Sequence, residues 1–364
     1  MKLLLLAIRR DPLLWLLVFV PVVFIGARIA PEAHTLLFVL STLAIVPLAV
    51  LLSHATETVA ARIGDALGGL LNATLGNLTE LVIALTALHA GQYVLVKASL
   101  AGAIVTNTLF MLGASFLLGG LRHHVQEFNP SSVRLQDVQL FLATIALLIP
   151  STVIDAEPTQ AAAFAQTVSL CLAILLIAVY ALGLLFSLRT HAELFAAVEH
   201  AAADEAPWPM GLALGTLACV AVLVGLASEI FVESVQEAAA TLGMTPAFVG
   251  FIVVPLTGGA AEIASAFSAA RRNRLDLSVS IALGSAAQIA LFVAPVLVLA
   301  SYAIGPSPIN LQFWPSAVAM MLIAAFTAWF VSSSGRVAWF NGVLVLAVYT
   351  IFAITLYLLP PRTG

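Results

Sequence analysis

The sequence predicts an all-α polytopic membrane protein with eleven transmembrane helices: one leading helix, then two inverted five-helix repeats whose motif helices are discontinuous. Three observations lead to this prediction. Of the 364 residues, 62% are hydrophobic and only 9% are charged, and the mean hydropathy is +1.10, whereas about a quarter of the residues in a typical soluble domain are charged. Eleven apolar runs are long enough to cross a bilayer. A polar pentad that ends in a carboxylate occurs twice, half a chain apart.

The apolar runs predict the spans. A spanning helix needs at least about 18 predominantly apolar residues. The first run is longer than the apolar core of a secretory signal and shows no convincing small-residue cleavage site, so we interpret it as a retained span. The runs lie near residues 12–30, 34–53, 67–90, 97–120, 135–154, 160–187, 209–228, 244–270, 276–301, 309–333 and 336–358.

The basic residues predict the orientation. With a cytoplasmic N-terminus and an external C-terminus, three basic residues fall outside, namely Arg28, Lys97 and Arg362. Cytoplasmic loops of membrane proteins carry an excess of Lys and Arg, and abundant Arg and Ala with scarce Lys indicate a prokaryotic inner membrane. The basic residues on the cytoplasmic side are Lys2, Arg9, Arg10, Arg62, Arg122, Arg134, Arg189, Arg271, Arg272, Arg274 and Arg336.

A long polar interruption divides the chain into two halves. Residues 188–208 contain four acidic side chains and form a predicted cytoplasmic linker, either a solvated amphipathic helix or a regulatory cation site. Without the first span, five spans precede the linker and five follow it, and a unit with an odd number of spans repeated in tandem enters the membrane in opposite orientations. We therefore expect an N-terminal segment with the first span (1–33), a first repeat (34–187), the linker (188–208) and a second repeat (209–364).

Each half contains one of the pentads. The first pentad is Gly76-Asn77-Leu78-Thr79-Glu80 and the second is Gly258-Gly259-Ala260-Ala261-Glu262, with 182 positions between the two glutamates. An ionised Glu at bilayer depth costs at least about 2.5 kcal/mol, so such a residue usually faces a cavity or an ion path. The run from Ser99 to Asn107 recurs in the run from Ser280 to Gln288, 181 positions later, which supports the repeat.

The residue types around the pentads favour a hard cation. The glycines weaken the helices, so that backbone carbonyls such as those of Gly76 and Gly258 become free. Two carboxylates, an Asn, a Gln, hydroxyls and carbonyls form an all-oxygen set that suits Ca²⁺. The seven His residues lie in loops or at span ends, and the two Cys residues lie within spans. The alternative for Asn107 and Gln288 is hydrogen bonding between helices.

Two acidic residues precede the pentads in related settings. Glu57 lies at the cytoplasmic end of a predicted span and Glu233 at the external end of another. We predict that they take part in proton coupling or cation access, since negative charge at an entrance attracts cations. A solvated helix face is the alternative interpretation for both residues.

The pentads and the run from Ser280 to Pro295 resemble the calcium/proton exchangers of the calcium/cation antiporter superfamily. The resemblance extends over most of the chain and includes the eleven-span plan and the acidic linker. It implies that Glu80 and Glu262 bind Ca²⁺ and protons alternately. It also implies supporting polar groups at Asn77, Thr79, Asn107, Ser285 and Gln288.

The chain departs from the pattern of that family at two positions. Gly259 stands where the family usually has Asn, and Ala103 stands where a Ser is common. Backbone carbonyls or water would have to replace the missing oxygens. The ninth span offers the neutral Gln288 in place of the aspartate of some sodium/calcium relatives, which favours proton coupling over sodium.

The sequence thus predicts a secondary-active Ca²⁺/H⁺ antiporter that works by alternating access, with Glu80 and Glu262 as shared ligands. Its partners would be Ca²⁺, H⁺ and the lipid bilayer, without a cofactor or nucleic acid, and homo-oligomer formation is left open. The alternatives are a Na⁺/Ca²⁺ or other cation exchanger of the same fold and a passive cation channel. An intramembrane enzyme is the weakest alternative, because the spans lack a Ser-Lys or Ser-His pair and a His-Glu-x-x-His motif.

Overall fold

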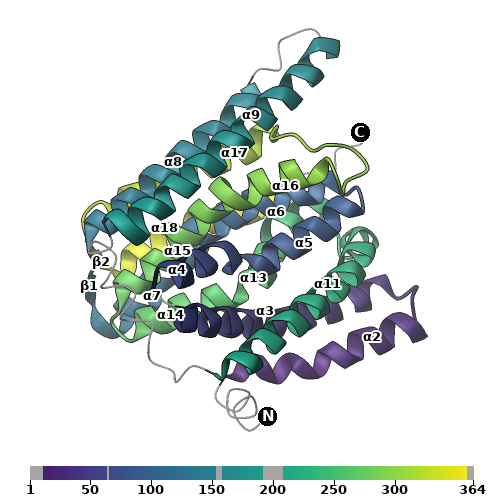
Figure 1. The fold of residues 1–364 in the computed structure, drawn as a ribbon, viewed down its shortest axis with the longest axis horizontal. Coiled ribbons are helices and arrows are strands. Elements are labelled where there is room, and N and C mark those ends of the chain that lie inside the picture. The colour runs from purple at the N-terminus through teal and green to yellow at the C-terminus, as the bar shows by residue number, and fades with distance from the viewer. Residues whose placement is uncertain (1–10, 64, 153–157, 192–207, 359–364) are drawn as a thin grey trace.

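Helices make up nearly all of the chain that the computed structural model describes, which is residues 11–63, 65–152, 158–191 and 208–358 (Figure 1). This follows from the apolar runs, because in hydrocarbon the backbone N–H and C=O groups must be paired within the segment. Most of the predicted linker, residues 192–207, lies outside the described part. The elements of the first half are η1 (Pro12–Val18), α2 (Phe19–Ile29), α3 (His34–Ile63), α4 (Asp65–Leu75), α5 (Leu78–His89), α6 (Tyr93–Val105), η2 (Thr106–Met111), α7 (Leu112–His123), β1 (Val125–Glu127), α8 (Pro130–Thr152), α9 (Pro158–Leu185) and η3 (Phe186–Thr190).

The second half repeats this pattern of long helices, broken helices and single π-helical turns. Helix α11 corresponds to α3, and the broken segment from α12 to α14 precedes α15 as α4 and α5 precede α6. The elements of the second half are α11 (Met210–Thr241), α12 (Pro246–Phe248), η5 (Val249–Val253), α13 (Val254–Gly258), α14 (Ala260–Arg271), α15 (Leu275–Gln288), η6 (Ile289–Val293), α16 (Ala294–Ser301), α17 (Pro315–Ser332), β2 (Arg336–Ala338) and α18 (Trp339–Leu358).

Local sequence signals place several of the helix ends. Asp11 accepts a hydrogen bond from the backbone N–H of Leu13 at 2.9 Å, directly before Pro12 at the first helical position. Thr245 caps α12 in the same way, with Pro246 following it. These are common N-terminal arrangements, because a capping oxygen satisfies an otherwise unpaired N–H and proline needs no such partner. Gly243, with φ of +69°, directly follows the residue that closes α11.

Among the described residues, nine helices are long and apolar enough to cross a membrane. The count becomes ten if the pair Pro246–Gly258 and Ala260–Arg271, which is bent by 62°, forms one span. The predicted span 67–90 is divided into α4 and α5, and α5 is apolar but shorter than a spanning helix. Helices α3 and α11 extend well past the predicted ends at 53 and 228, because loss of apolarity marks the edge of the bilayer and does not end a helix.

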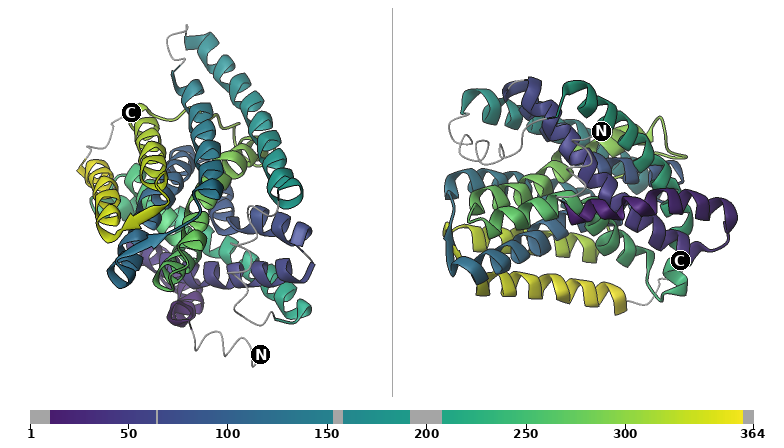
Figure 2. Two further views of the ribbon diagram at one scale, coloured as in Figure 1. Left: turned by 90° about the vertical axis from the view of Figure 1, so that its left-hand side faces the viewer. Right: turned by 90° about the horizontal axis from the view of Figure 1, so that it is seen from below.

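The helices form three layers (Figures 1 and 2). Helices α3 and α11 cross each other and, with α2, form the layer at the bottom of Figure 1, whereas α8, α9 and α17 form the layer at the top. Helices α5, α6, α13, α15 and α16 lie between these layers. Helix α5, which follows the first pentad, lies in the middle layer, and the second pentad lies between α13 of that layer and α14, which packs against α3.

The loops gather at two ends of the molecule. At one end, β1 pairs antiparallel with β2, Glu127 lies 3.0 Å from Arg336, and Gln126 donates a hydrogen bond to the carbonyl of Ala270. At the other end, the backbone N–H of Ser307 donates to the hydroxyl of Tyr93, and Lys97 donates to the side chain of Asn310 at 2.6 Å. The segments in each group are those that the sequence predicts to share one side of a membrane.

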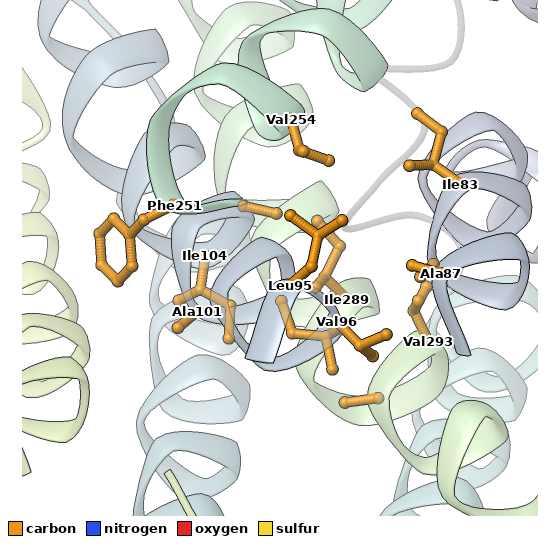
Figure 3. Close-up of a cluster of buried hydrophobic side chains, with 14 of the residues drawn as sticks. Ile83, Ala87, Leu95, Val96, Ala101, Ile104, Phe251, Val254, Ile289 and Val293 are labelled. Atoms are coloured by element: carbon orange, nitrogen blue, oxygen red, sulfur yellow. The ribbon is translucent and has the colours of Figure 1, made fainter. Parts of the chain in front are cut away.

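Apolar side chains from both halves fill the middle layer, and the backbones approach closely there (Figure 3). A Cβ atom on Gly102 of α6 would lie 2.2 Å from the carbonyl oxygen of Phe251 in η5, and one on Gly250 would lie 2.5 Å from the Cβ of Ala98. Only glycine permits this contact between the two halves. The labelled side chains in Figure 3 are Ile83, Ala87, Leu95, Val96, Ala101, Ile104, Phe251, Val254, Ile289 and Val293.

Candidate functional site

The two pentads form equivalent helix starts. Helix α5 begins after Asn77 and carries Glu80 in its first turn, and α14 begins after Gly259 and carries Glu262 in its first turn. The backbone dihedrals φ and ψ are −97° and 29° at Asn77 and −80° and 8° at Gly259. The N-terminus of a helix presents unpaired N–H groups and partial positive charge, which favours a carboxylate in the first turn. Both glutamates have this setting.

Glu80 of the first half lies directly against the second pentad. A Cβ atom on Gly258 would lie 3.1 Å from the Cγ of Glu80, and one on Gly259 would lie 3.3 Å from its Oε1. Glu80 and Glu57 are the acidic neighbours of Glu262. The Oε2 atom of Glu262 is buried, and no hydrogen-bond partner for it occurs in the described part of the chain. The two carboxylates thus form one site, and neither takes part in the ion pairs found among the described residues.

A chain of hydrogen bonds connects the two halves beside the glutamates. The amide of Asn107 donates to the hydroxyl of Ser285 at 2.8 Å, and this hydroxyl donates to Oδ1 of Asn77 at 2.8 Å. The amide of Asn77 in turn donates to Oε1 of Gln288 at 2.7 Å. Asn77, Asn107 and Ser285 are at most 4% exposed. Buried polar groups cost free energy unless they are paired, and here the two halves pair one another's groups.

Asn107 and Gln288 are positioned by related irregularities in their helices. Asn107 lies within the π-helical turn η2, and Gln288 directly precedes the π-helical turn η6. Single π-helical turns inside α-helices are frequently found at functional sites. The two polar side chains therefore come from equivalent places in the fourth and ninth predicted spans.

The remaining candidate ligands lie nearby. A Cβ atom on Gly76 would be 3.7 Å from Oε1 of Gln288, and Gly258 contacts Glu80. Thr79 is 4% exposed in the first turn of α5, but within the described residues its hydroxyl is not part of the hydrogen-bonded chain formed by Asn107, Ser285, Asn77 and Gln288. The described part of the chain contains no cluster of three or more His, Cys, Asp or Glu residues that could hold a metal ion.

Glu57 and Glu233 lie on the two crossed helices. Glu57 is exposed on α3, and its Oε1 accepts a hydrogen bond from the hydroxyl of Ser53 at 2.9 Å. Glu233 is exposed on α11. Helix α3 packs against α13 and α14 of the other half, and α11 packs against α5 of the other half. Each acidic residue is thus carried by a helix that contacts the motif helix of the opposite half of the chain.

One buried carboxylate was missed by the sequence reasoning. Asp137 of α8 is 4% exposed, and its Oδ2 accepts a hydrogen bond from the hydroxyl of Ser332 in α17 at 2.6 Å. No partner for its Oδ1 is found among the described residues. The signal was available, because an acidic residue within a predicted span is noteworthy in itself, but Asp137 belongs to neither pentad.

The chain has sequence relatives among known proteins. The model of the family described as sodium/calcium exchanger protein matches residues 33–189 and 212–358. A protein of Aphanothece halophytica named Ca(2+)/H(+) antiporter is 38% identical over 365 residues, which cover 96% of this chain and 97% of the relative. The Ca(2+)/H(+) antiporter ChaA of Bacillus subtilis is 36% identical, with 93% of this chain and 97% of the relative covered.

Solved structures have the same fold. The structure of native YfkE superimposes with a TM-score of 0.80 at 34% identity and covers 93% of this chain and 97% of its own. The crystal structure of the H⁺/Ca²⁺ exchanger CAX gives a TM-score of 0.68 at 18% identity, with 96% of this chain and 88% of the other covered. At that identity the second comparison concerns the fold alone.

Proposed function

Because the chain belongs to the sodium/calcium exchanger protein family, we propose that Glu80 and Glu262 are the shared ligands through which it exchanges Ca²⁺ for protons across a membrane. The exchange activity follows from relatives that align over nearly their whole length and are named Ca²⁺/H⁺ antiporters. The chain is an integral membrane transporter of this kind, not an enzyme. What we propose is which residues perform the exchange.

The packing of Glu80 against the second pentad supports this assignment. Two carboxylates from different halves meet in a site without a described cation. In surroundings of low dielectric, their mutual repulsion can be relieved either by one divalent ion or by two protons. Binding of the one therefore excludes the other. This competition couples the Ca²⁺ flux to the proton flux when access to the site alternates between the two sides of the membrane and only the occupied site changes sides.

The oxygen atoms available at the site are sufficient for Ca²⁺ when backbone carbonyl groups or water molecules are included. Ca²⁺ takes about six to eight oxygen ligands, and the two carboxylates supply at most four. Side-chain oxygens of the neighbouring polar residues and carbonyl groups at the helix breaks supply others, with water in the remaining positions. The proposed ligand set is Glu80, Glu262, Asn77, Thr79, Gly76, Gly258, Asn107, Gln288 and Ser285.

The proposed membrane topology has eleven spans. The broken pair α4 and α5 forms the third span, and the bent segment from α12 to α14 forms the eighth. The first span precedes two inverted repeats, 34–187 and 209–364, and the two segments matched by the family model, 33–189 and 212–358, support this division. The N-terminus lies in the cytoplasm and the C-terminus outside.

Transport driven only by an imposed pH gradient tests the function. Purified protein in lipid vesicles, with the voltage clamped and sodium absent, is expected to accumulate Ca²⁺ against its gradient as protons leave. A Na⁺/Ca²⁺ exchanger would require sodium. A passive channel would equilibrate Ca²⁺ without accumulating it.

Removing the bridging hydroxyl tests the polar chain between the halves. Ser285→Ala leaves the oxygen of Asn77 and one amide N–H of Asn107 without their partner, and each unpaired buried group costs about 1–3 kcal/mol. We expect the Ca²⁺ concentration for half-maximal uptake to rise about tenfold. Ser41→Ala is the matched control, since the buried hydroxyl of Ser41 donates to the carbonyl of Phe38 in its own helix. Equal behaviour of the two variants would argue that Ser285 does not organise the site.

The two acidic residues on the crossed helices are proposed to guard opposite entrances. Glu57→Gln is expected to impair exchange from the cytoplasmic side and Glu233→Gln from the external side, each by a few-fold, because an exposed charge raises the local cation concentration. Vesicles of known orientation, with Ca²⁺ dependence measured from each face, provide the test. Symmetric loss, or no loss in either variant, would return both residues to a solvated helix face.

A further inference from the structure

The two halves of the candidate site differ at the position directly before the motif helix. The residue before each motif helix is Asn77 in the first half and Gly259 in the second, and the backbone has nearly the same conformation at both. Both φ values are negative, a region open to every residue type. The glycine at 259 is therefore not required by its backbone conformation, and the space beside it needs another explanation.

That space is occupied by the carboxyl group of Glu80. Gly258 and Gly259 together form a recess, here called the Gly258–Gly259 notch. A Cβ on Gly258 would meet the Cγ and Cδ of Glu80 at 3.1 and 3.4 Å, and a Cβ on Gly259 would meet its Oε1 at 3.3 Å. In the first half, the side chain of Asn77 stands at the position equivalent to Gly259 and bonds to Ser285 and Gln288.

The displacement that an added methyl group would require is similar to the difference in metal–oxygen distance between divalent cations. A contact of 3.0–3.4 Å means that the neighbouring atom must give by a few tenths of an ångström. Oxygen ligands lie about 2.3–2.6 Å from Ca²⁺ and about 2.0–2.1 Å from Mg²⁺, a difference of similar size. A methyl group in the notch would displace the Glu80 carboxyl by a distance of this order.

From these observations we propose that the Gly258–Gly259 notch sets the width of the cation site by receiving the Glu80 carboxyl, and so determines which divalent cations fit. This inference rests on the proposed function of Glu80 as a ligand. The notch acts through Glu80, so Gly258 and Gly259 are positioning residues for selectivity. Filling the notch narrows the site and favours smaller ions, whereas withdrawing the carboxyl from it favours larger ones.

The experiment measures Ca²⁺ binding to the purified protein in competition with Mn²⁺, which is smaller than Ca²⁺, and with Sr²⁺, which is larger. Gly259→Ala and Gly258→Ala are each expected to shift the Mn²⁺-to-Sr²⁺ preference towards Mn²⁺ by about fivefold, within the range for residues in direct contact. Glu80→Asp shortens the side chain and is expected to shift the preference towards Sr²⁺. Gly215→Ala is the matched control, because nothing lies within 4 Å of its added methyl.

The double variant Gly259→Ala/Glu80→Asp decides whether the notch acts through Glu80. If the methyl acts by displacing the Glu80 carboxyl, it should have little effect once the side chain is shortened, so the double variant is expected to keep the preference of Glu80→Asp alone. An equal shift towards Mn²⁺ on adding Gly259→Ala to either background, or unchanged preference in every folded single variant, would overturn the proposal. A Cβ on Gly259 also lies 2.9 Å from the carbonyl oxygen of Pro255. If that variant fails to fold, Gly258→Ala and Glu80→Asp still carry the test.

The proposed role of the notch and the proposed exchange function are tested independently of each other. Binding competition needs no proton gradient, whereas exchange does. If the unmodified protein shows no pH-driven Ca²⁺ uptake, Ca²⁺/H⁺ exchange is contradicted. The binding preferences of the notch variants still test the notch in that case. Normal uptake together with unchanged preferences in the notch variants would contradict the notch alone.

Discussion

Glu80→Gln and Glu262→Gln are each expected to abolish pH-driven Ca²⁺ uptake, with a loss of more than about 100-fold. Even residues that only support metal ligands cost about 10–100-fold in affinity when they are changed, and here the change removes a charged ligand and a proton acceptor together. The amide has nearly the shape of the carboxyl group, so the fold should be retained. Uptake of radioactive Ca²⁺ into vesicles with an imposed pH gradient is the measurement.

Glu32→Gln is the control for this pair, because it makes the same chemical change at a side chain that is 95% exposed. It should transport as the unmodified protein does. If either Glu80→Gln or Glu262→Gln kept near-normal uptake, that carboxylate would not be an obligatory ligand, and the assignment of one shared site to two halves would be wrong.

Gly102→Ala is expected to have the largest effect on stability. The added Cβ would lie 2.2 Å from the carbonyl oxygen of Phe251, which is backbone and cannot swing aside as a flexible side chain could. Overpacking of a close contact costs about 1–3 kcal/mol and occasionally more. We therefore expect the apparent melting temperature in detergent, followed by tryptophan fluorescence, to fall by about 5 °C or more.

Gly215→Ala is the control for Gly102→Ala, since the space around Gly215 is open. There the change from glycine to alanine within α11 should be neutral or stabilising, because alanine has the higher helix propensity. A melting temperature of Gly102→Ala equal to that of Gly215→Ala would mean that α6 and η5 can separate without cost.

The sequence predicted those features of the fold that depend on local composition. Apolar runs located the helices, and the glycines of the pentads indicated where helices weaken, which is where α4 ends before Gly76 and where the chain bends at Gly259. It did not predict the length of α3, because polar residues such as His54 and Glu57 continue a helix beyond the bilayer as readily as apolar ones.

The contacts within the candidate site were only partly predictable. The repeat spacing placed Glu80, Glu262, Asn107 and Gln288 in related settings, but their partners depend on how two segments about 180 residues apart meet. The bridging position of Ser285 and the seat of Glu80 on Gly258 and Gly259 are tertiary contacts of this kind. No local pattern in one sequence specifies them.

The crossed pair α3 and α11 has a mechanical consequence. Each helix touches the motif helix of the opposite half, so a movement of the pair alters the contacts of both pentads together. Packed helices shift between discrete arrangements and do not deform continuously. We therefore expect the surroundings of both pentads to change in one step when this pair moves, so that ions reach the shared site from one side of the membrane at a time.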